Sequence, residues 1–183
     1  VTGQTFTDIT SQSGIIVLPD LGDVAIWIDY NNDGWLDIFG STQNQTLFYH
    51  NNGDGTFSDI TEQSGLATTT PQSLAVGDYD NDGYTDILLS SLHTIDPLKV
   101  YRNNSGNGFV ETFNTGVSTN RGIWMDYDCD GHLDIFCLTW GGTPHLFRND
   151  GNGSFEDVTQ NMGFNQSSGT TASASDYNND GFP

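Results

Sequence analysis

The sequence predicts an all-β chain built from β-propeller blades, each a sheet of four antiparallel strands. Three observations support this prediction. An acidic loop with a central glycine recurs about every 49 residues, a second motif follows each complete loop, and the intervening segments are rich in β-branched and aromatic residues. Units of roughly 40 to 50 residues with four short strands each, repeated around an axis, are typical of propellers.

The acidic loop has the pattern D-x-[DN]-x-D-G-x-x-D. It reads DYNNDGWLD from Asp29, DYDNDGYTD from Asp78 and DYDCDGHLD from Asp126, and a fourth copy, DYNNDGFP, begins at Asp176. Alternate side chains on a tightly curled loop converge on one point, and oxygen-bearing residues there suit Ca²⁺, which takes about six to eight oxygen ligands. Glycine at position 6 lets the chain reverse sharply. We therefore interpret these loops as calcium sites.

Each complete loop is predicted to bind one Ca²⁺ through positions 1, 3, 5, 7 and 9, with position 7 offering its backbone carbonyl. This gives three complete sites and a partial fourth. The predicted ligands are Asp29, Asn31, Asp33, Trp35 and Asp37; Asp78, Asp80, Asp82, Tyr84 and Asp86; Asp126, Asp128, Asp130, His132 and Asp134; and Asp176, Asn178, Asp180 and Phe182.

Two other interpretations of the loop were weighed. An EF-hand begins in the same way but needs Glu at position 12 and a helix on each side. Position 12 is Gly40, Leu89 or Cys137, in β-rich sequence, so the EF-hand is excluded. The remaining alternative is a solvated turn without metal, because Asp, Asn and Gly are also ordinary turn residues. Repetition at matched places favours the metal site.

Composition limits the partners that this chain can bind. Its 183 residues include 24 Asp and Glu against 4 Lys and Arg, for a formal charge of −20. Nucleic acid is therefore an improbable partner, since its phosphates require a basic face. No apolar run approaches the ~20 residues of a membrane-spanning helix, so no membrane insertion is expected. More than half of the acidic residues lie in the loops, which predicts stability that depends on metal.

The second motif defines the repeat boundaries. It occupies residues 47–66, 100–117 and 146–164, and its tail also opens the chain at residues 5–15. We therefore expect residues 1–20 to form the last strand of a preceding blade and residues 165–183 the first strand of a truncated one, with three blades at 21–66, 67–117 and 118–164. The first strand of each blade is apolar on both faces and is expected to be buried on both. Trp27, Ile123 and Trp124 are expected to pack between blades.

Together the two motifs resemble the FG-GAP and VCBS-type repeats of integrin α-chain propellers, and they are especially similar to the bacterial and cartilage-acidic-protein branch of that superfamily. The resemblance implies a calcium-loaded propeller, usually seven-bladed, in secreted or surface proteins for adhesion or recognition. Three full blades do not close a ring. The chain, which starts at Val1 rather than Met, is therefore expected to be a fragment of a longer protein, with self-association through open blade edges.

The leading functional hypothesis is a calcium-stabilised module for protein or carbohydrate recognition, with structural metal and no enzymatic activity. Plentiful free calcium predicts an extracellular, cell-surface or periplasmic location. Trp140, beside two glycines, and His93 are candidate ligand-binding residues on loops opposite the metal loops; for Trp140, capping the core edge is an equal alternative. The alternative function is the propeller part of a secreted calcium-dependent enzyme, such as a polysaccharide lyase or phospholipase. Cys129 and Cys137 are expected to be free thiols.

Overall fold

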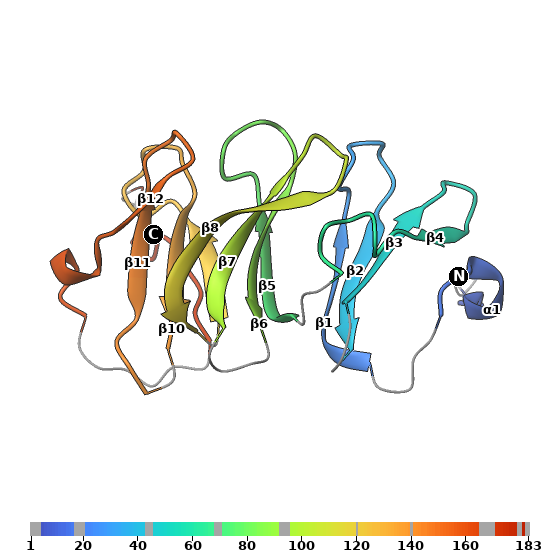
Figure 1. The fold of residues 1–183 in the computed structure, drawn as a ribbon, viewed down its shortest axis with the longest axis horizontal. Coiled ribbons are helices and arrows are strands. Elements are labelled where there is room, and N and C mark those ends of the chain that lie inside the picture. Colours follow the sequence, from blue (N-terminus) through green and yellow to red (C-terminus); the bar gives the residue numbers. More distant parts are fainter. Residues whose placement is uncertain are drawn as a thin grey trace.

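The structure is a computed structural model that describes residues 5–16, 21–42, 46–67, 71–91, 96–119, 121–139, 141–164, 171–178 and 181. Its described part is all-β, with three four-stranded antiparallel sheets, which confirms the predicted fold class (Figure 1). The strands are β1 (Leu21–Ile28), β2 (Asp37–Thr42), β3 (Thr46–Asn51) and β4 (Phe57–Asp59); β5 (Pro71–Gly77), β6 (Asp86–Ser91), β7 (Pro97–Asn103) and β8 (Phe109–Ser118); and β9 (Arg121–Met125), β10 (Asp134–Leu138), β11 (His145–Asn149) and β12 (Phe155–Asp157).

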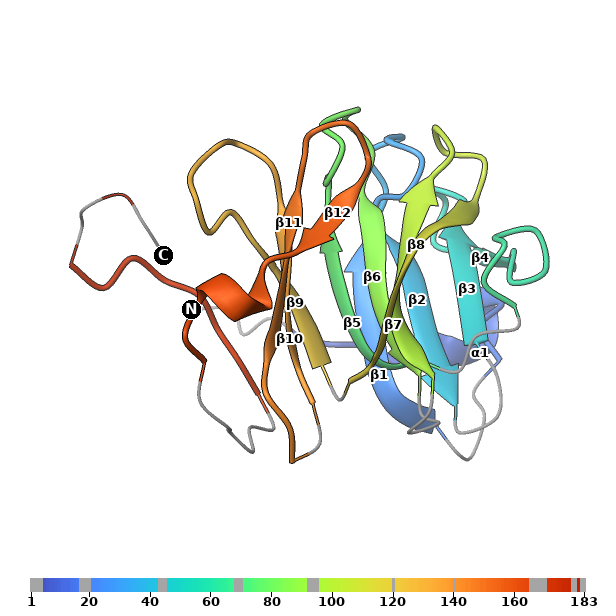
Figure 2. The same cartoon turned by 60° about the vertical axis from the view of Figure 1, so that its left-hand side comes forward.

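Each sheet is a blade in which strand order follows chain order. The orders are β1-β2-β3-β4, β5-β6-β7-β8 and β9-β10-β11-β12. The blades lie one beside the next along the chain, as Figures 1 and 2 show from two directions. Strand β1 contacts β5 and β5 contacts β9, so neighbouring blades meet along their first strands. The acidic loop joins the first and second strands of every blade, and the three loops therefore gather at one end of the sheets (Figure 1).

Apolar side chains between successive blades form two buried clusters. The cluster between the first two blades includes Ile28, Phe39 and Phe48 of the first blade, packed with Ile87 and Leu89 of the second. The cluster between the second and third blades is built in the same way; its buried members are Tyr79, Leu88, Leu98, Val100, Ile135, Cys137 and Phe147. Burial of this apolar surface stabilises the arc of blades, because each sheet buries its faces only against its neighbours.

The most buried strand of each blade is the second, whereas the sequence predicted the first. In β2 five of the six residues are buried, whereas six of the seven residues of β5 are only half-buried. The reason is position within the sheet. The first strand of each blade is an edge strand, with a hydrogen-bonded neighbour on one side, and the second strand has a neighbour on both sides.

The two tryptophans expected between blades behave differently. Trp124 stacks on Tyr79 of the second blade, with ring centroids 5.7 Å apart and planes 4° apart, as predicted. Trp27 occupies the same place in the first blade, two residues before its loop, but is 59% exposed. It faces the side of the first blade on which the described chain places no further sheet, and its ring lies 6.4 Å from that of Phe57. Ile123 is half-buried and lines a shallow apolar cavity on the outer face of the third blade.

The segment before the first blade contains α1 (Thr10–Ser13), and no strand is formed in residues 5–16, where the sequence predicted one. A strand requires a neighbour to hydrogen-bond with, and this segment meets none. It still packs as the tail of a repeat. A Cβ atom at Gly14 would lie 2.7 Å from the carbonyl oxygen of Phe57, at the start of β4. The equivalent Gly65 lies against the carbonyl oxygen of Phe109, at the start of β8, in the same way. At the other end, the described residues 171–178 form no strand.

Candidate metal centre

The three complete loops share one backbone conformation. Position 4 is left-handed in each, with φ of 58° at Asn32, 57° at Asn81 and 58° at Cys129. The glycine at position 6 follows with φ between 87° and 89° in all three loops. Asparagine tolerates the left-handed region better than most residues, and glycine enters it without steric cost. The repeated pattern D-x-[DN]-x-D-G thus specifies one curled shape.

The first carboxylate of each loop holds that curl together. Oδ1 of Asp78 accepts a 3.0 Å hydrogen bond from the backbone N–H of Asp82, and its Oδ2 accepts one of 2.9 Å from Gly83. The corresponding bonds occur at Asp29 and Asp126, with lengths of 3.0 to 3.1 Å. The fourth loop begins alike, since Gly181 donates to Asp176 over 2.8 Å.

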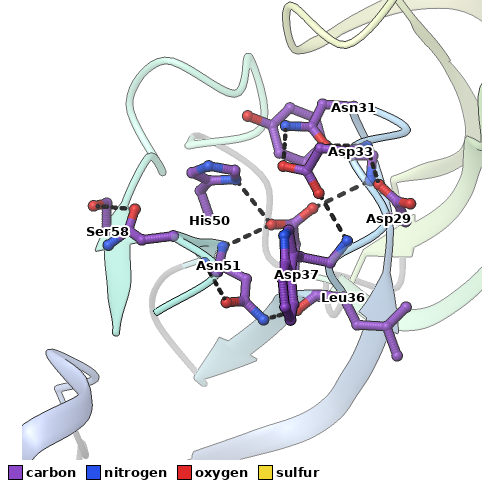
Figure 3. Close-up of polar contacts among 12 residues, drawn as sticks. Asp29, Asn31, Asp33, Leu36, Asp37, His50, Asn51 and Ser58 are labelled. Atoms are coloured by element: carbon purple, nitrogen blue, oxygen red, sulfur yellow. Dashed lines mark hydrogen bonds and ion pairs between the residues drawn. The ribbon is translucent and has the colours of Figure 1, made fainter. Parts of the chain in front are cut away.

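The carboxylate at position 9 ties the loop to the rest of its blade. Asp86 is fully buried; its Oδ2 accepts the N–H of Tyr79 over 3.0 Å, and its Oδ1 accepts that of Asn103 over 2.7 Å. Asp37 and Asp134 are equally buried and make the same two bonds. Figure 3 shows Asp37 in this role, reached from one side by its own loop and from the other by Asn51 of β3.

Carboxylate oxygens converge inside the second and third loops. Oxygens of Asp78, Asp80 and Asp86 lie within 4.8 Å of one another, and so do oxygens of Asp126, Asp128 and Asp130. In the first loop, position 3 is Asn31, whose Nδ2 donates to Oδ2 of Asp33 over 2.9 Å. Like charges at such short range repel unless a cation or a proton offsets them. The loops therefore have the donors and the excess charge that a divalent cation requires.

One carboxylate oxygen in the third loop lacks a hydrogen-bond donor among the described residues. Oδ1 of Asp128 is buried and accepts no hydrogen bond from the described residues, although it belongs to a convergent carboxylate cluster. A buried carboxylate oxygen without a donor costs free energy, so such atoms call for an explanation. A hard cation in the cluster would satisfy it. The residues present therefore fit an oxygen-ligated ion such as Ca²⁺.

Burial changes the acidity of the position-9 carboxyls. Desolvation raises the pKa of Asp86 to about 7 and that of Asp134 to about 6, against the opposing effect of their backbone N–H donors. Desolvation also raises the pKa of Asp37, while bonds from Asn51, Tyr30 and His50 lower it. In the second loop, burial followed by the charge of Asp82 raises the pKa of Asp80. The raised pKa values of Asp86 and Asp134 mean that the second and third loops, when free of metal, take up protons as the pH falls to about 7 and about 6, and cation binding would release them.

Basic side chains beside the first and second loops were not anticipated. Nδ1 of His50 lies 3.0 Å from Oδ1 of Asp37, and Nη1 of Arg102 lies 3.9 Å from Oδ2 of Asp80. The signal was present in the sequence, because His50, Arg102 and Arg148 each come directly before the asparagine of the second motif. The two loops with four aspartates have arginine at this place, and the loop with three has histidine. This pattern matches local charge, since arginine is always cationic.

The residue at position 7, whose carbonyl is a predicted ligand, also packs its side chain against a hairpin turn. A Cβ atom at Gly53 would lie 2.9 Å from Nε1 of Trp35, and one at Gly151 would lie 2.5 Å from Nε2 of His132. Both glycines lie in the hairpin turn between the third and fourth strands of the same blade. The position-7 side chain therefore lies across that turn in the first and third blades, which explains the glycine there in these two copies of the second motif; the second copy has Ser105.

Several predicted residues lie outside the described part of the chain. These are the ligand candidates His93 and Trp140, and Asp180 and Phe182 of the fourth loop. Neither Cys129 nor Cys137 is in a disulfide, and Cys137 is buried in the second cluster, where desolvation raises the pKa of its thiol to about 12. Within the residues that the structure describes, no helix is long and apolar enough to cross a membrane.

Two named relatives are similar to part of this chain. Cartilage acidic protein 1 of Xenopus tropicalis is 27% identical over 146 residues, which cover 72% of this chain and 23% of that protein. Cartilage acidic protein 1 of Mus musculus is 29% identical over 110 residues, covering 55% of this chain and 17% of that protein. The chain thus spans less than a quarter of the length of either relative.

A solved structure shares the arrangement of strands. It is a lectin of Agrocybe aegerita described as specifically recognising non-reducing terminal N-acetylglucosamine; it has a TM-score of 0.51 and 24% identity, and the match covers 72% of this chain and 37% of that one. This likeness concerns the fold. Among family models, that of the FG-GAP-like repeat matches residues 29–89 and 126–183, and that of the FG-GAP repeat matches residues 70–109. The two matches to the first model begin at Asp29 and Asp126, the first residues of the first and third acidic loops. The match to the second model begins just before β5, the strand that precedes the second acidic loop. Because the first model covers more than half of the chain, the chain belongs to the FG-GAP-like repeat family.

Proposed function

We propose that this chain is a calcium-stabilised β-propeller module that recognises a protein or carbohydrate outside the cell. The observation that carries the proposal is the repeated loop, in which carboxylates converge on one point and Oδ1 of Asp128 is buried without a hydrogen-bond donor. A bound divalent cation would offset the negative charge of each loop. The loop residues fix the turn between the first two strands of each blade, so the proposed role of the metal is structural.

Thermal unfolding with and without calcium tests the metal. Chelator should lower Tm by many degrees, and added Ca²⁺ should restore it, because an ion that binds the folded state alone stabilises it by mass action. Calorimetric titration should count three sites in the described loops. An unchanged Tm on chelation, with circular dichroism showing an intact fold, would contradict the calcium proposal.

The recognition role rests on the family and on the loops at the end of the blades opposite the metal. Support for a carbohydrate ligand comes from the lectin of similar fold, which recognises terminal N-acetylglucosamine. A glycan array that includes N-acetylglucosamine-terminated oligosaccharides is the direct test. Trp140→Ala should abolish binding, because an aromatic face stacks on a sugar ring. Trp27→Ala is the matched control, since Trp27 is exposed on the flank of the first blade.

No catalytic reaction belongs to this proposal. Turnover of acidic polysaccharides or phospholipids by the chain in the presence of calcium would contradict it and would favour a calcium-dependent enzyme instead. An extracellular, cell-surface or periplasmic location is proposed because free calcium is plentiful there. If Ca²⁺ still stabilises the protein at the low calcium concentrations of the cytoplasm, free calcium no longer argues for a location outside the cell.

A further inference from the structure

Side chains from one blade hold the metal loop of the next. The position-4 residue of each loop, held in the left-handed conformation, reaches the position-6 carbonyl of the following loop. Nδ2 of Asn32 donates to the carbonyl oxygen of Gly83 over 2.8 Å, and Nδ2 of Asn81 donates to that of Gly131 over 3.2 Å. The third loop continues the pattern, because Sγ of Cys129 lies 2.8 Å from the carbonyl oxygen of Gly181.

The peptide group that receives this bond also carries a predicted ligand contact. The carbonyl of Gly131 accepts from Asn81, and the N–H of the same peptide, on His132, donates to Oδ1 of Asp130 over 2.9 Å. In the second loop the equivalent N–H belongs to Tyr84, which donates over 2.9 Å to the position-5 carboxylate. One peptide plane therefore separates the side chain of one blade from the position-5 carboxylate of the next.

A second bridge crosses each junction in the opposite direction. Nδ2 of Asn149, at the end of β11, donates to the carbonyl of Tyr79 in the second loop over 2.9 Å and to that of Leu133 in its own loop over 3.1 Å. Its backbone N–H donates to the position-9 carboxylate of Asp134 over 2.8 Å. Asn103 makes the corresponding bonds one blade earlier, to the first and second loops.

The geometry points to coupled loops: we infer that Asn32, Asn81, Asn103 and Asn149 are positioning residues that make successive metal loops fill cooperatively. The inference rests on the cation binding proposed above. Position 4 lies between two predicted ligands of its own loop, at positions 3 and 5. Fixing those ligands fixes the direction of the position-4 side chain, which orders the position-6 to position-7 peptide of the next loop. A loop that is already ordered loses less conformational entropy when it binds.

The test removes the position-4 amides without disturbing the backbone. Asn32 and Asn81 are exposed, and glycine accepts their left-handed φ, so the double variant N32G/N81G should fold with a Tm near that of the wild type at saturating Ca²⁺. Ser105→Gly is the matched control. Ser105 is also left-handed, with φ of 50°, but it lies in the β7–β8 hairpin turn rather than in a loop bridge.

Calorimetric titration with Ca²⁺ should give a wild-type Hill coefficient above one, which N32G/N81G lowers toward one while the number of bound ions stays the same. The S105G control should behave as the wild type. Loss of coupling should weaken overall affinity about fivefold or more. Amide hydrogen exchange at Tyr84 and His132, followed by NMR with calcium present, should become faster in N32G/N81G and not in S105G.

The outcomes separate the two proposals. A wild type that binds no Ca²⁺ overturns both cation binding and coupling. Three ions bound with the same Hill coefficient in the wild type and N32G/N81G, together with unchanged exchange at His132, overturn the coupling alone. If the double variant fails to fold, the single variant N32G applies the same test to the first junction through exchange at Tyr84.

Discussion

Nδ2 of Asn149 lies 2.9 Å from the carbonyl oxygen of Tyr79, a residue 70 positions earlier in the chain and one blade away. Asn149 is 1% exposed, and its amide also bonds to Leu133 and to the backbone of Gly151. Each of these bonds satisfies a main-chain group of a metal loop or a hairpin turn. The asparagine of the second motif is therefore a structural link between blades rather than a turn residue.

Asn149→Ala should lower the free energy of unfolding by about 2 kcal/mol or more, because it leaves buried main-chain groups without partners. Urea unfolding in saturating Ca²⁺ measures the change. Asn107→Ala is the control, since Asn107 is exposed and its amide bonds only within its own turn; its effect should stay within about 0.5 kcal/mol. Equal effects of the two variants would show that the bridge contributes nothing.

Asp128→Asn should have opposite effects in the two metal states. Without metal it removes a negative charge whose Oδ1 is buried without a donor among the described residues, within a cluster of like charges, so Tm should rise by on the order of 2–4 °C. Addition of Ca²⁺ should raise the Tm of this variant by less than it raises the Tm of the wild type, because one predicted ligand has lost its charge. Differential scanning fluorimetry with chelator and with Ca²⁺ gives both numbers. Glu62→Gln, an exposed change outside the loops, should alter neither.

The stability of the metal-free protein should fall as pH rises from about 4 to about 8. The pKa values of Asp86 and Asp134 are raised to about 7 and about 6, so across this range the folded state binds more protons than the unfolded state. Stability then decreases with pH, by on the order of a few kcal/mol in total. With Ca²⁺ the trend should reverse, because the ion binds the deprotonated loops. Chemical unfolding at pH 5 and pH 8, with and without chelator, measures these trends in the free energy of unfolding. A metal-free protein that is more stable at pH 8 than at pH 5 would contradict the claim that burial raises the pKa of these two carboxyls.

Trp124→Ala and Trp27→Ala compare the same repeat position in two settings. Trp124 stacks on Tyr79 and lies near Phe155, so its loss should cost about 2 to 4 kcal/mol. Trp27 is 59% exposed and should cost less than about 1 kcal/mol. Urea unfolding of both variants measures the difference. Similar losses at the two positions would mean that Trp27 is covered in solution.

The sequence was sufficient to predict the blades and the loops, because both depend on local patterns that recur. Gly34, Gly83 and Gly131 mark the same turn in each repeat, and the alternation of apolar residues gives the strands. Residues 5–16 have the sequence of a repeat's tail and lie against the start of β4, but the strand expected there is not formed, because pairing depends on neighbours that the local pattern does not reveal.

The bridges between blades could not be predicted in the same way. Asn32 and Gly83 are 51 residues apart, and only the packing of two blades brings them together. In the sequence Asn32 has the character of an ordinary turn residue, and in the structure it does adopt a left-handed turn conformation. His50 was overlooked for a related reason. Its role becomes visible only when it is aligned with Arg102 and Arg148, because the residue type differs between the copies and only the basic character is shared.

The curl of each loop is held by its own main-chain N–H groups, which donate to the carboxylates at positions 1, 5 and 9, as in the first loop. An emptied loop would therefore keep the course of its turn, and binding would order only its ligand side chains and the position-6 to position-7 peptide. Refilling would require no rebuilding of the turn, so entry should be governed by the shedding of water from the incoming ion. The blades would tolerate repeated loss and recovery of their ions without passing through an unfolded state.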